Sequence, residues 1–251
     1  MRMEVPILIF DIEGEYGHFR KYNTTTSPLT YSIPPRTAVV GILGAILGIK
    51  REHQPGIFPD QPVQELFNKQ NAWIAIQILN SVKKVNVGFN LIDTKKHFFD
   101  LTKAKHTQIN FELLKNPKFR IFVHLKDENY FSDLEERLKQ KKFVYTPYFG
   151  LAQFIANIEF VGKTSARLIE NNNEYVEIIT ALNLNKIQGI EEPLKFDYNF
   201  YYVVNNMYLE MDRNREVSEY ADVLIERNGK PILAKVKQYY RLSEKGNIVF
   251  L

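Results

Sequence analysis

The order of apolar patterns along residues 5–161 constrains the fold of this chain more than any other feature. Residues 5–12 form an apolar run rich in branched side chains, which is typical of a buried strand. Residues 36–49 carry apolar side chains at helical spacing and follow two prolines, which the first turn of a helix tolerates. Further patterns predict a helix at 131–142 and strands at 72–79, 82–91, 119–125 and 152–161.

These elements follow one another as strand, helix, strand, insert, strand, helix and strand. This βαββαβ order predicts an α+β protein with a ferredoxin-like core, which is also the RRM fold. The insert covers about residues 90–117 and is basic and weakly patterned, so we expect it to project from the core as a thumb.

Residues 162–251 have the composition of a small antiparallel β-rich portion, and we place a boundary between it and a core at 1–161. Asn228 and Gly229 form a strong turn signal, because both residue types accept a positive φ. We therefore expect residues 221–226 and 231–239 to pair as a hairpin.

Two local signals concern the helices. Gly41, Gly44 and Gly48 recur at spacings of three and four, so we expect them to share one side of a helix where another backbone approaches closely. Ser132 and Glu135 form a capping-box pattern, which predicts that the second helix begins at Ser132.

Several classes of protein are disfavoured by composition. The chain has no cysteine, which excludes thiolate chemistry, and its five scattered histidines predict no metal site; we expect no cofactor. No apolar run approaches the ~18 residues of a membrane span, and the N-terminal apolar stretch is too short for a signal peptide. The expected location is the cytoplasm, with no membrane partner.

Positive charge is concentrated in two segments. Residues 18–36 hold three basic residues and no acidic ones, and residues 82–120 hold nine basic residues against three acidic ones. The other residues contain 21 basic and 26 acidic side chains, a net charge of −5 in a chain whose total is +4. This distribution predicts a polyanionic partner.

Four stretches of sequence carry a family resemblance. They run from Phe10 to Arg20, from Thr26 to Tyr31, from Pro34 to Ile46 (PPRTAVVGILGAI) and from Tyr145 to Ala152 (YTPYFGLA). In this order and spacing the chain resembles the CRISPR-associated Cas-five family of the RAMP superfamily, and is most similar to its type I-B members.

The resemblance implies a ferredoxin-like core with a basic thumb, in a non-catalytic protein of antiviral defence. Such a subunit binds the 5′ handle of the crRNA at one end of a Cascade complex. Its implied partners are the crRNA, a backbone subunit and the large subunit, with an indirect contact to target DNA.

Cations and aromatic rings are what hold single-stranded RNA, and residues 18–22 (HFRKY) supply both. Arg36 would add a guanidinium at a helix N-terminus, a favourable place for an anion. A structural interpretation stays open, in which Phe19 and Tyr22 pack under the loop and Arg36 makes a surface ion pair. The candidate RNA-binding residues are His18, Arg20, Lys21, Tyr22, Arg36, Lys95, Lys96, His97, Lys103, Lys105 and His106.

Two alternative functions remain open. The first is a metal-independent endoribonuclease, since a type I-C branch of the family cuts precursor crRNA with a tyrosine, a lysine and a histidine. Lys96 with His97, or Lys105 with His106, and a tyrosine such as Tyr22 supply those residue types. The second is a scaffold that joins protein subunits through the aromatic C-terminal strands, with incidental RNA contact. Its candidate residues are Tyr198, Phe200, Tyr201, Tyr202, Tyr208, Tyr239 and Tyr240.

Overall fold

The computed structural model describes residues 4–21, 27–51, 61–92, 106–188, 192–196, 199–243 and 246–251. Its helices are α1 (Arg36–Leu47), α2 (Val63–Leu66) and α3 (Glu128–Gln140), with a 3-10 turn at Leu184–Lys186. Its strands are β1 (Glu4–Glu13), β2 (Tyr16–Gly17), β3 (Ala72–Ile78), β4 (Lys84–Ile92), β5 (His106–Lys115), β6 (Lys118–Leu125), β7 (Asn157–Glu170), β8 (Val176–Ile178), β9 (Leu182–Asn183), β10 (Leu194–Lys195), β11 (Tyr201–Met211), β12 (Val217–Glu226), β13 (Ile232–Ala234), β14 (Gln238–Leu242) and β15 (Gly246–Ile248).

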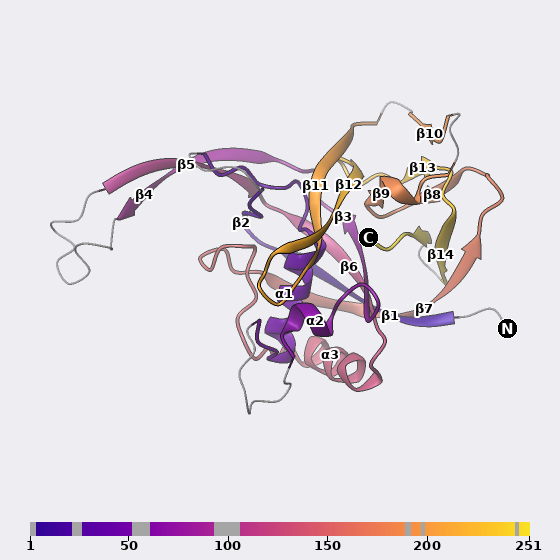
Figure 1. The fold of residues 1–251 in the computed structure, drawn as a ribbon, viewed down its shortest axis with the longest axis horizontal. Helices are drawn as coiled ribbons and strands as arrows, with labels where there is room; N and C mark the ends of the chain where they lie inside the picture. Colours follow the sequence, from indigo (N-terminus) through magenta and orange to yellow (C-terminus); the bar gives the residue numbers. More distant parts are fainter. Residues whose placement is uncertain are drawn as a thin grey trace.

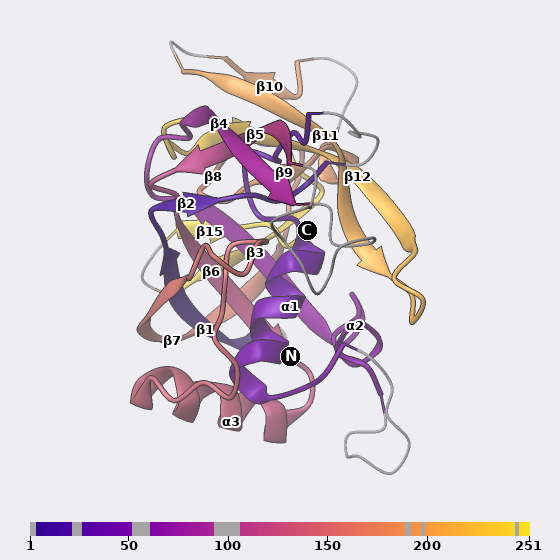
Figure 2. The same cartoon turned by 90° about the vertical axis from the view of Figure 1, so that its left-hand side faces the viewer.

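Four strands form the centre of the largest sheet, in the order β7-β1-β6-β3, and every neighbouring pair among them is antiparallel. Together with α1 after β1 and α3 after β6, this gives the βαββαβ arrangement of a ferredoxin-like core. The predicted α+β class and core order are therefore confirmed. Figures 1 and 2 show α1 and α3 on one side of this sheet.

Strand β1 is buried on both faces, which explains its unbroken apolar sequence. Leu8 and Phe10 belong to the main core, which includes apolar residues of α1 and α3. Ile7 and Ile9 point the other way and pack in a second cluster with Phe250 from the C-terminal end of the chain. The last residues of the chain thus cover the face of the sheet that the helices leave open.

The helices begin and end for identifiable reasons. Helix α1 starts after Pro35 and ends at Gly48, whose φ of 79° gives the left-handed C-cap that glycine favours. Helix α3 starts after Asp127, whose carboxylate accepts hydrogen bonds from the backbone N–H groups of Asn129 and Tyr130. The predicted N-cap at Ser132 is wrong, because Asp127 caps the helix five residues earlier.

The insert between β3 and β6 is a long antiparallel hairpin of β4 and β5, paired from Lys84↔Leu114 to Ile92↔His106. It projects from the body of the molecule (Figure 1), and its base joins β2 in a separate small sheet. The hairpin begins at Lys84, somewhat before the predicted residue 90. We call β4 and β5 the basic hairpin below.

Strand β7 starts at Asn157, five residues later than predicted, and runs to Glu170. Its first half pairs with β1 alone, and its second half also pairs with β14 of the C-terminal portion. The boundary expected after residue 161 therefore falls inside a strand. The C-terminal strands extend the core sheet, with β11, β12 and β9 forming a separate sheet.

The hairpin expected around Asn228 and Gly229 is wrong, because β12 pairs with β11 and β9 whereas β13 pairs with β8 and β10. The turn instead closes on the buried Glu226, whose carboxylate accepts the backbone N–H groups of Asn228 at 2.8 Å and Lys230 at 2.7 Å. Gly229, at φ 79°, lies so close to the carbonyl oxygen of Ile78 that a Cβ would stand 2.2 Å from it. The chain passes here from one sheet to the other.

None of the helices among the described residues is both long enough and apolar enough to span a membrane.

Candidate nucleic-acid interface

The segment between β2 and α1 is a loop whose two arms pair with each other. Arg20 and Thr30 form a β-bridge, and the backbone N–H of Tyr31 donates to the carbonyl of Phe19 at 2.8 Å. Lys21 N–H donates to the Leu29 carbonyl at 2.9 Å. These bonds fix the backbone on both sides of the tip, while the predicted RNA ligand Tyr22 lies outside the described residues.

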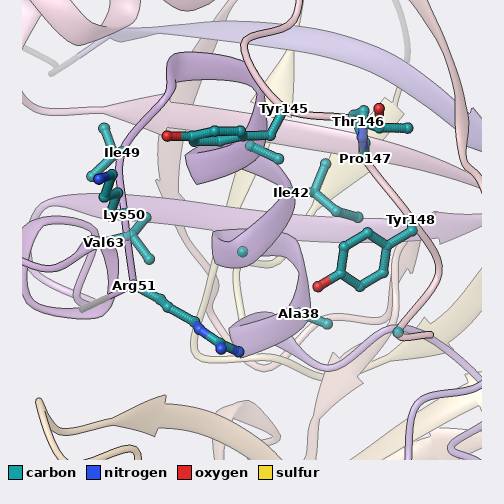
Figure 3. A pocket seen from close by; sticks show the side chains of 13 residues that line it. Ala38, Ile42, Ile49, Lys50, Arg51, Val63, Tyr145, Thr146, Pro147 and Tyr148 are labelled. Atoms are coloured by element: carbon teal, nitrogen blue, oxygen red, sulfur yellow. The ribbon is translucent and has the colours of Figure 1, made fainter. Parts of the chain in front are cut away.

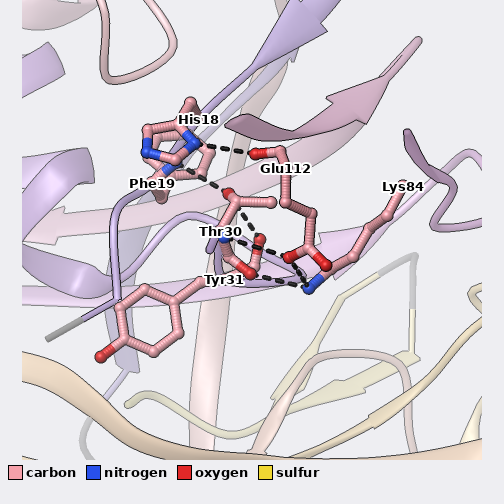
Figure 4. Close-up of polar contacts among 6 residues, drawn as sticks. All are labelled: His18, Phe19, Thr30, Tyr31, Lys84 and Glu112. Atoms are coloured by element: carbon pink, nitrogen blue, oxygen red, sulfur yellow. Dashed lines mark hydrogen bonds and ion pairs between the residues drawn. The ribbon is translucent and has the colours of Figure 1, made fainter. Parts of the chain in front are cut away.

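A polar network ties this loop to the basic hairpin (Figure 4). The Glu112 carboxylate of β5 accepts the Thr30 N–H at 3.1 Å and the Lys84 ammonium at 2.8 Å. Lys84 Nζ also donates to the Thr30 carbonyl at 2.7 Å. The Thr30 hydroxyl in turn accepts the Phe19 N–H at 2.9 Å. The two basic segments found in the sequence are therefore held together at their bases.

Histidine 18 lies inside this junction and not on its surface. Only 2% of His18 is exposed, its Nδ1 donates to the Glu112 carbonyl at 2.8 Å, and its ring packs edge-on against Phe111. Burial lowers the pKa of His18, and the charge of Arg20 lowers that pKa further. The prediction of His18 as an RNA ligand is corrected: it is a neutral residue that packs the loop against the hairpin.

The burial of His18 predicts a pH dependence of stability. Because the folded-state pKa lies below the ordinary value of 6.5, the unfolded chain takes up a proton that the folded chain does not. The free energy of unfolding should then fall as the pH drops below about 6.5. His124 has a lowered pKa for the same reason, burial, and adds to the effect.

The variant His18→Asn separates the two histidines, since asparagine retains a donor near the Glu112 carbonyl and does not titrate. Urea unfolding at pH 7 and pH 5 should show a smaller loss of stability in this variant than in the unmodified chain. A matched His124→Asn variant reports the other site. An unchanged loss in His18→Asn would contradict the assignment of His18.

Arg36 is also buried, which corrects its prediction as an anion site at the start of α1. The residue is 2% exposed, and its guanidinium donates to the carbonyls of Phe67 at 2.9 Å, Ala72 at 2.7 Å and Leu209 at 3.2 Å. Burial lowers its pKa to about 10, while Glu210 and Glu219 act in the opposite direction. Arg36 is a structural cation that RNA cannot reach.

Lys21 is partly buried beside this network. Its ammonium lies 5.8 Å from the centre of the Tyr31 ring. Burial lowers the pKa of Lys21, the nearby charge of Lys84 lowers it further, and Glu112 raises it. Arg20, beside Lys21, is exposed, as are Lys83, His106 and Lys115 on the hairpin.

Part of the positive charge counted in the sequence is neutralised by distant carboxylates. Lys118 pairs with Glu13 at 2.7 Å, and Arg120 makes a two-bonded ion pair with Asp11 across β1 and β6. These two cations contribute to the sheet and not to the interface. The densest predicted clusters, with Lys95, Lys96, His97, Lys103 and Lys105, lie outside the described residues, and only His106 is placed, at the start of β5.

A cleft beside α1 was not predicted from the sequence. Residues 145–150 form one wall, and both Tyr145 and Tyr148 are exposed there (Figure 3). The signal for it was the YTPYFG stretch, which places two tyrosines around a proline with no strand or helix pattern. In the part of the chain that the structure describes, no three His, Asp or Glu side chains are grouped so that they could hold a metal ion.

The sequence matches a family described as CRISPR-associated protein (Cas_Cas5) over residues 7–231. No curated protein matches it.

The chain is similar to several solved structures. A CRISPR protein from Archaeoglobus fulgidus aligns over 98% of this chain and 99% of its own, with a TM-score of 0.51 and 14% identity. A chain of a CRISPR RNA-guided surveillance complex aligns over 90% of this chain and 91% of its own, with a TM-score of 0.47 and 12% identity. A functionally uncharacterized protein from Streptococcus mutans aligns over 94% and 96%, with a TM-score of 0.45 and 10% identity.

Proposed function

Because the chain belongs to the CRISPR-associated Cas-five family, we propose that it binds the 5′ handle of the crRNA in a type I effector complex without cutting it. The motifs at residues 10–46 and 145–152 favour the type I-B branch within that family. The proposed partners are the crRNA, a backbone subunit and the large subunit, with an indirect contact to target DNA and a cytoplasmic location.

One observation carries this proposal: the loop with Arg20 and Lys21 is joined to the basic hairpin through Thr30, Lys84 and Glu112. Single-stranded RNA is held by a positively charged groove that follows its phosphates. A loop and a hairpin fixed to each other can bind one strand from two sides, because little conformational entropy is lost in ordering one relative to the other.

His18 does not fit the role of general base in the alternative endonuclease reaction. A general base for a 2′-hydroxyl needs an accessible group with a pKa near neutrality. His18 is buried, is hydrogen-bonded to a carbonyl and has a lowered pKa, so it does not meet this need. Endonuclease chemistry would have to come from Lys96 with His97 or from Lys105 with His106.

An incubation of the purified chain with its repeat RNA in EDTA tests the reaction directly. We expect the RNA to remain at full length over hours and to be shifted on a native gel. A defined product that disappears in the double variant His97→Ala and His106→Ala would establish the endoribonuclease instead. A product that persists in that variant would indicate a contaminating nuclease, and the gel shift would then decide whether the chain binds.

A protein-binding surface accompanies the RNA site. Of the aromatic residues considered for a scaffold, Tyr239 is buried and Tyr201, Tyr208 and Tyr240 are partly buried, while Tyr198 lies outside the described residues. Phe200 and Tyr202 are 59% and 48% exposed at the start of β11. We propose the start of β11 as a contact with a neighbouring subunit, since exposed apolar side chains are common at such contacts.

A further inference from the structure

The cleft beside α1 has a volume of about 570 Å³. Its floor is one face of α1, built from Ala38, Gly41, Ile42 and Ala45. Figure 3 shows residues 49–51 and Val63 on one side of this face and Tyr148 on the other. A volume of this order holds a single small molecule or one nucleotide.

Gly41 has no structural reason to be glycine. A Cβ built there would meet nothing within 4 Å, whereas one at Gly44 would stand 2.8 Å from the Val63 side chain. Gly48 has its own reason, the positive φ of the C-cap. The expectation that another backbone approaches all three glycines is therefore wrong for Gly41, and at Gly48 the close neighbour is the Val144 side chain. Glycine inside a helix costs roughly 1 kcal/mol against alanine, and at Gly41 no intramolecular contact offsets it.

The wall opposite this floor is held in a fixed position. The backbone N–H groups of Val144 and Tyr145 donate to the carbonyls of Ile46 and Ala45 in the last turn of α1, at 3.3 and 2.9 Å. These are the acceptors that a helix end leaves without partners. Tyr145 and Tyr148 are nevertheless 46% and 43% exposed. Aromatic rings kept in contact with water on a fixed backbone are suited to stack on a flat ligand.

The same cleft is adjacent to the RNA loop and carries positive charge. At Gly150, the end of its wall, a Cβ would clash with the carbonyl oxygen of His18. Lys50 and Arg51 line the cleft, and none of the described residues that line it is acidic. A flat apolar floor, two exposed tyrosines and two cations match a nucleobase with its phosphate.

Resting on the proposed function, we propose that this cleft binds one unpaired nucleobase of the RNA. The ring lies on the floor at Gly41 beside Tyr145 or Tyr148, and the attached phosphate lies near Lys50 and Arg51. An apolar side chain of a partner protein fits the charge of the cleft less well. Because every nucleobase can stack on an aromatic ring, the site should bind all four bases with little sequence specificity.

The variant Gly41→Leu tests the site, since leucine is a good helix former and its side chain would fill the floor. We expect thermal stability equal to or above that of the unmodified chain. The affinity for a fluorescein-labelled repeat RNA should fall about ten-fold, as expected for the loss of one stacked base. Ser132→Leu, which adds the same side chain to an exposed position of α3, is the matched control and should bind RNA normally.

A second experiment measures the binding of repeat RNAs that each lack the base at a single position. Loss of the base at one of these positions should weaken binding to the unmodified chain about ten-fold and should not change binding to Gly41→Leu. Equal binding of RNA by Gly41→Leu and the unmodified chain overturns the proposal. If Gly41→Leu binds RNA normally but no longer assembles with the backbone subunit, the cleft is a protein contact. If the unmodified chain itself binds no RNA, the proposed function fails, which distinguishes the two results.

Discussion

Replacing Arg36 with methionine is expected to lower the free energy of unfolding by about 3–5 kcal/mol, a large part of the 5–15 kcal/mol that is typical of a folded domain. The guanidinium satisfies three buried carbonyls, of Phe67, Ala72 and Leu209. Methionine has a similar length and fills much of the space but offers no donor. Each carbonyl then loses its partner, at a cost of about 1–3 kcal/mol for a buried polar group.

The control for this variant is Arg137→Met, which removes a half-buried arginine paired with Asp133 one helical turn away at 2.7 Å. Pairs of this kind contribute about 0.3–0.5 kcal/mol. Urea unfolding of both variants at pH 7 gives the comparison. If both variants lower the free energy of unfolding by the same small amount, the hydrogen bonds of Arg36 do not stabilise the packing of α1 against β3 and β11.

The second large effect concerns the lysines between β4 and β5 in the sequence, which lie outside the described residues. Alanine at Lys95, Lys96, Lys103 and Lys105 together is expected to weaken binding of repeat RNA about 100-fold at low salt and to leave thermal stability unchanged. Each phosphate contact on a single strand contributes about 0.7 to the slope of log K against log salt concentration. Loss of four contacts should therefore reduce that slope by about 3.

A matched quadruple variant removes the same charge elsewhere, at the exposed residues Lys126, Lys142, Lys186 and Lys237. It should retain nearly the whole salt slope, because these lysines lie outside both basic segments. If the two quadruple variants lose affinity equally, net charge alone determines binding, and the lysines at positions 95–105 have no special part in it.

The core could be predicted because its signals are local. A run of branched residues, a proline pair before a helical pattern and period-two alternation are each contained in a short window, and they gave β1, α1, β3 and β6 nearly in place. The predicted start of α3 was wrong because the sequence offers two capping residues, and Asp127, the earlier one, accepts hydrogen bonds from the first N–H groups of the helix. The hairpin at Asn228 failed because Glu226 closes the turn and the flanking strands join different sheets.

The site was less predictable because it depends on residues far apart in the sequence. Arginine and histidine are residue types that often bind RNA at a protein surface, so the sequence alone favoured this role for Arg36 and His18. Their partners Leu209 and Glu112 are brought to them only by the completed fold. Ion pairing of Arg120 with Asp11 likewise removes charge that a local count assigns to the surface. The loop and the hairpin were predicted as separate basic segments, and the structure adds the network that joins them.

The central claim is that this chain binds handle RNA through the loop and the basic hairpin. It is tested most directly by measuring the affinity of the unmodified chain for repeat-derived RNA at about 50 and about 200 mM salt. We expect tight binding at the lower concentration and a loss of about 100-fold or more at the higher one, as several phosphate contacts require. No measurable binding at about 50 mM, or an affinity that salt does not change, would contradict the claim.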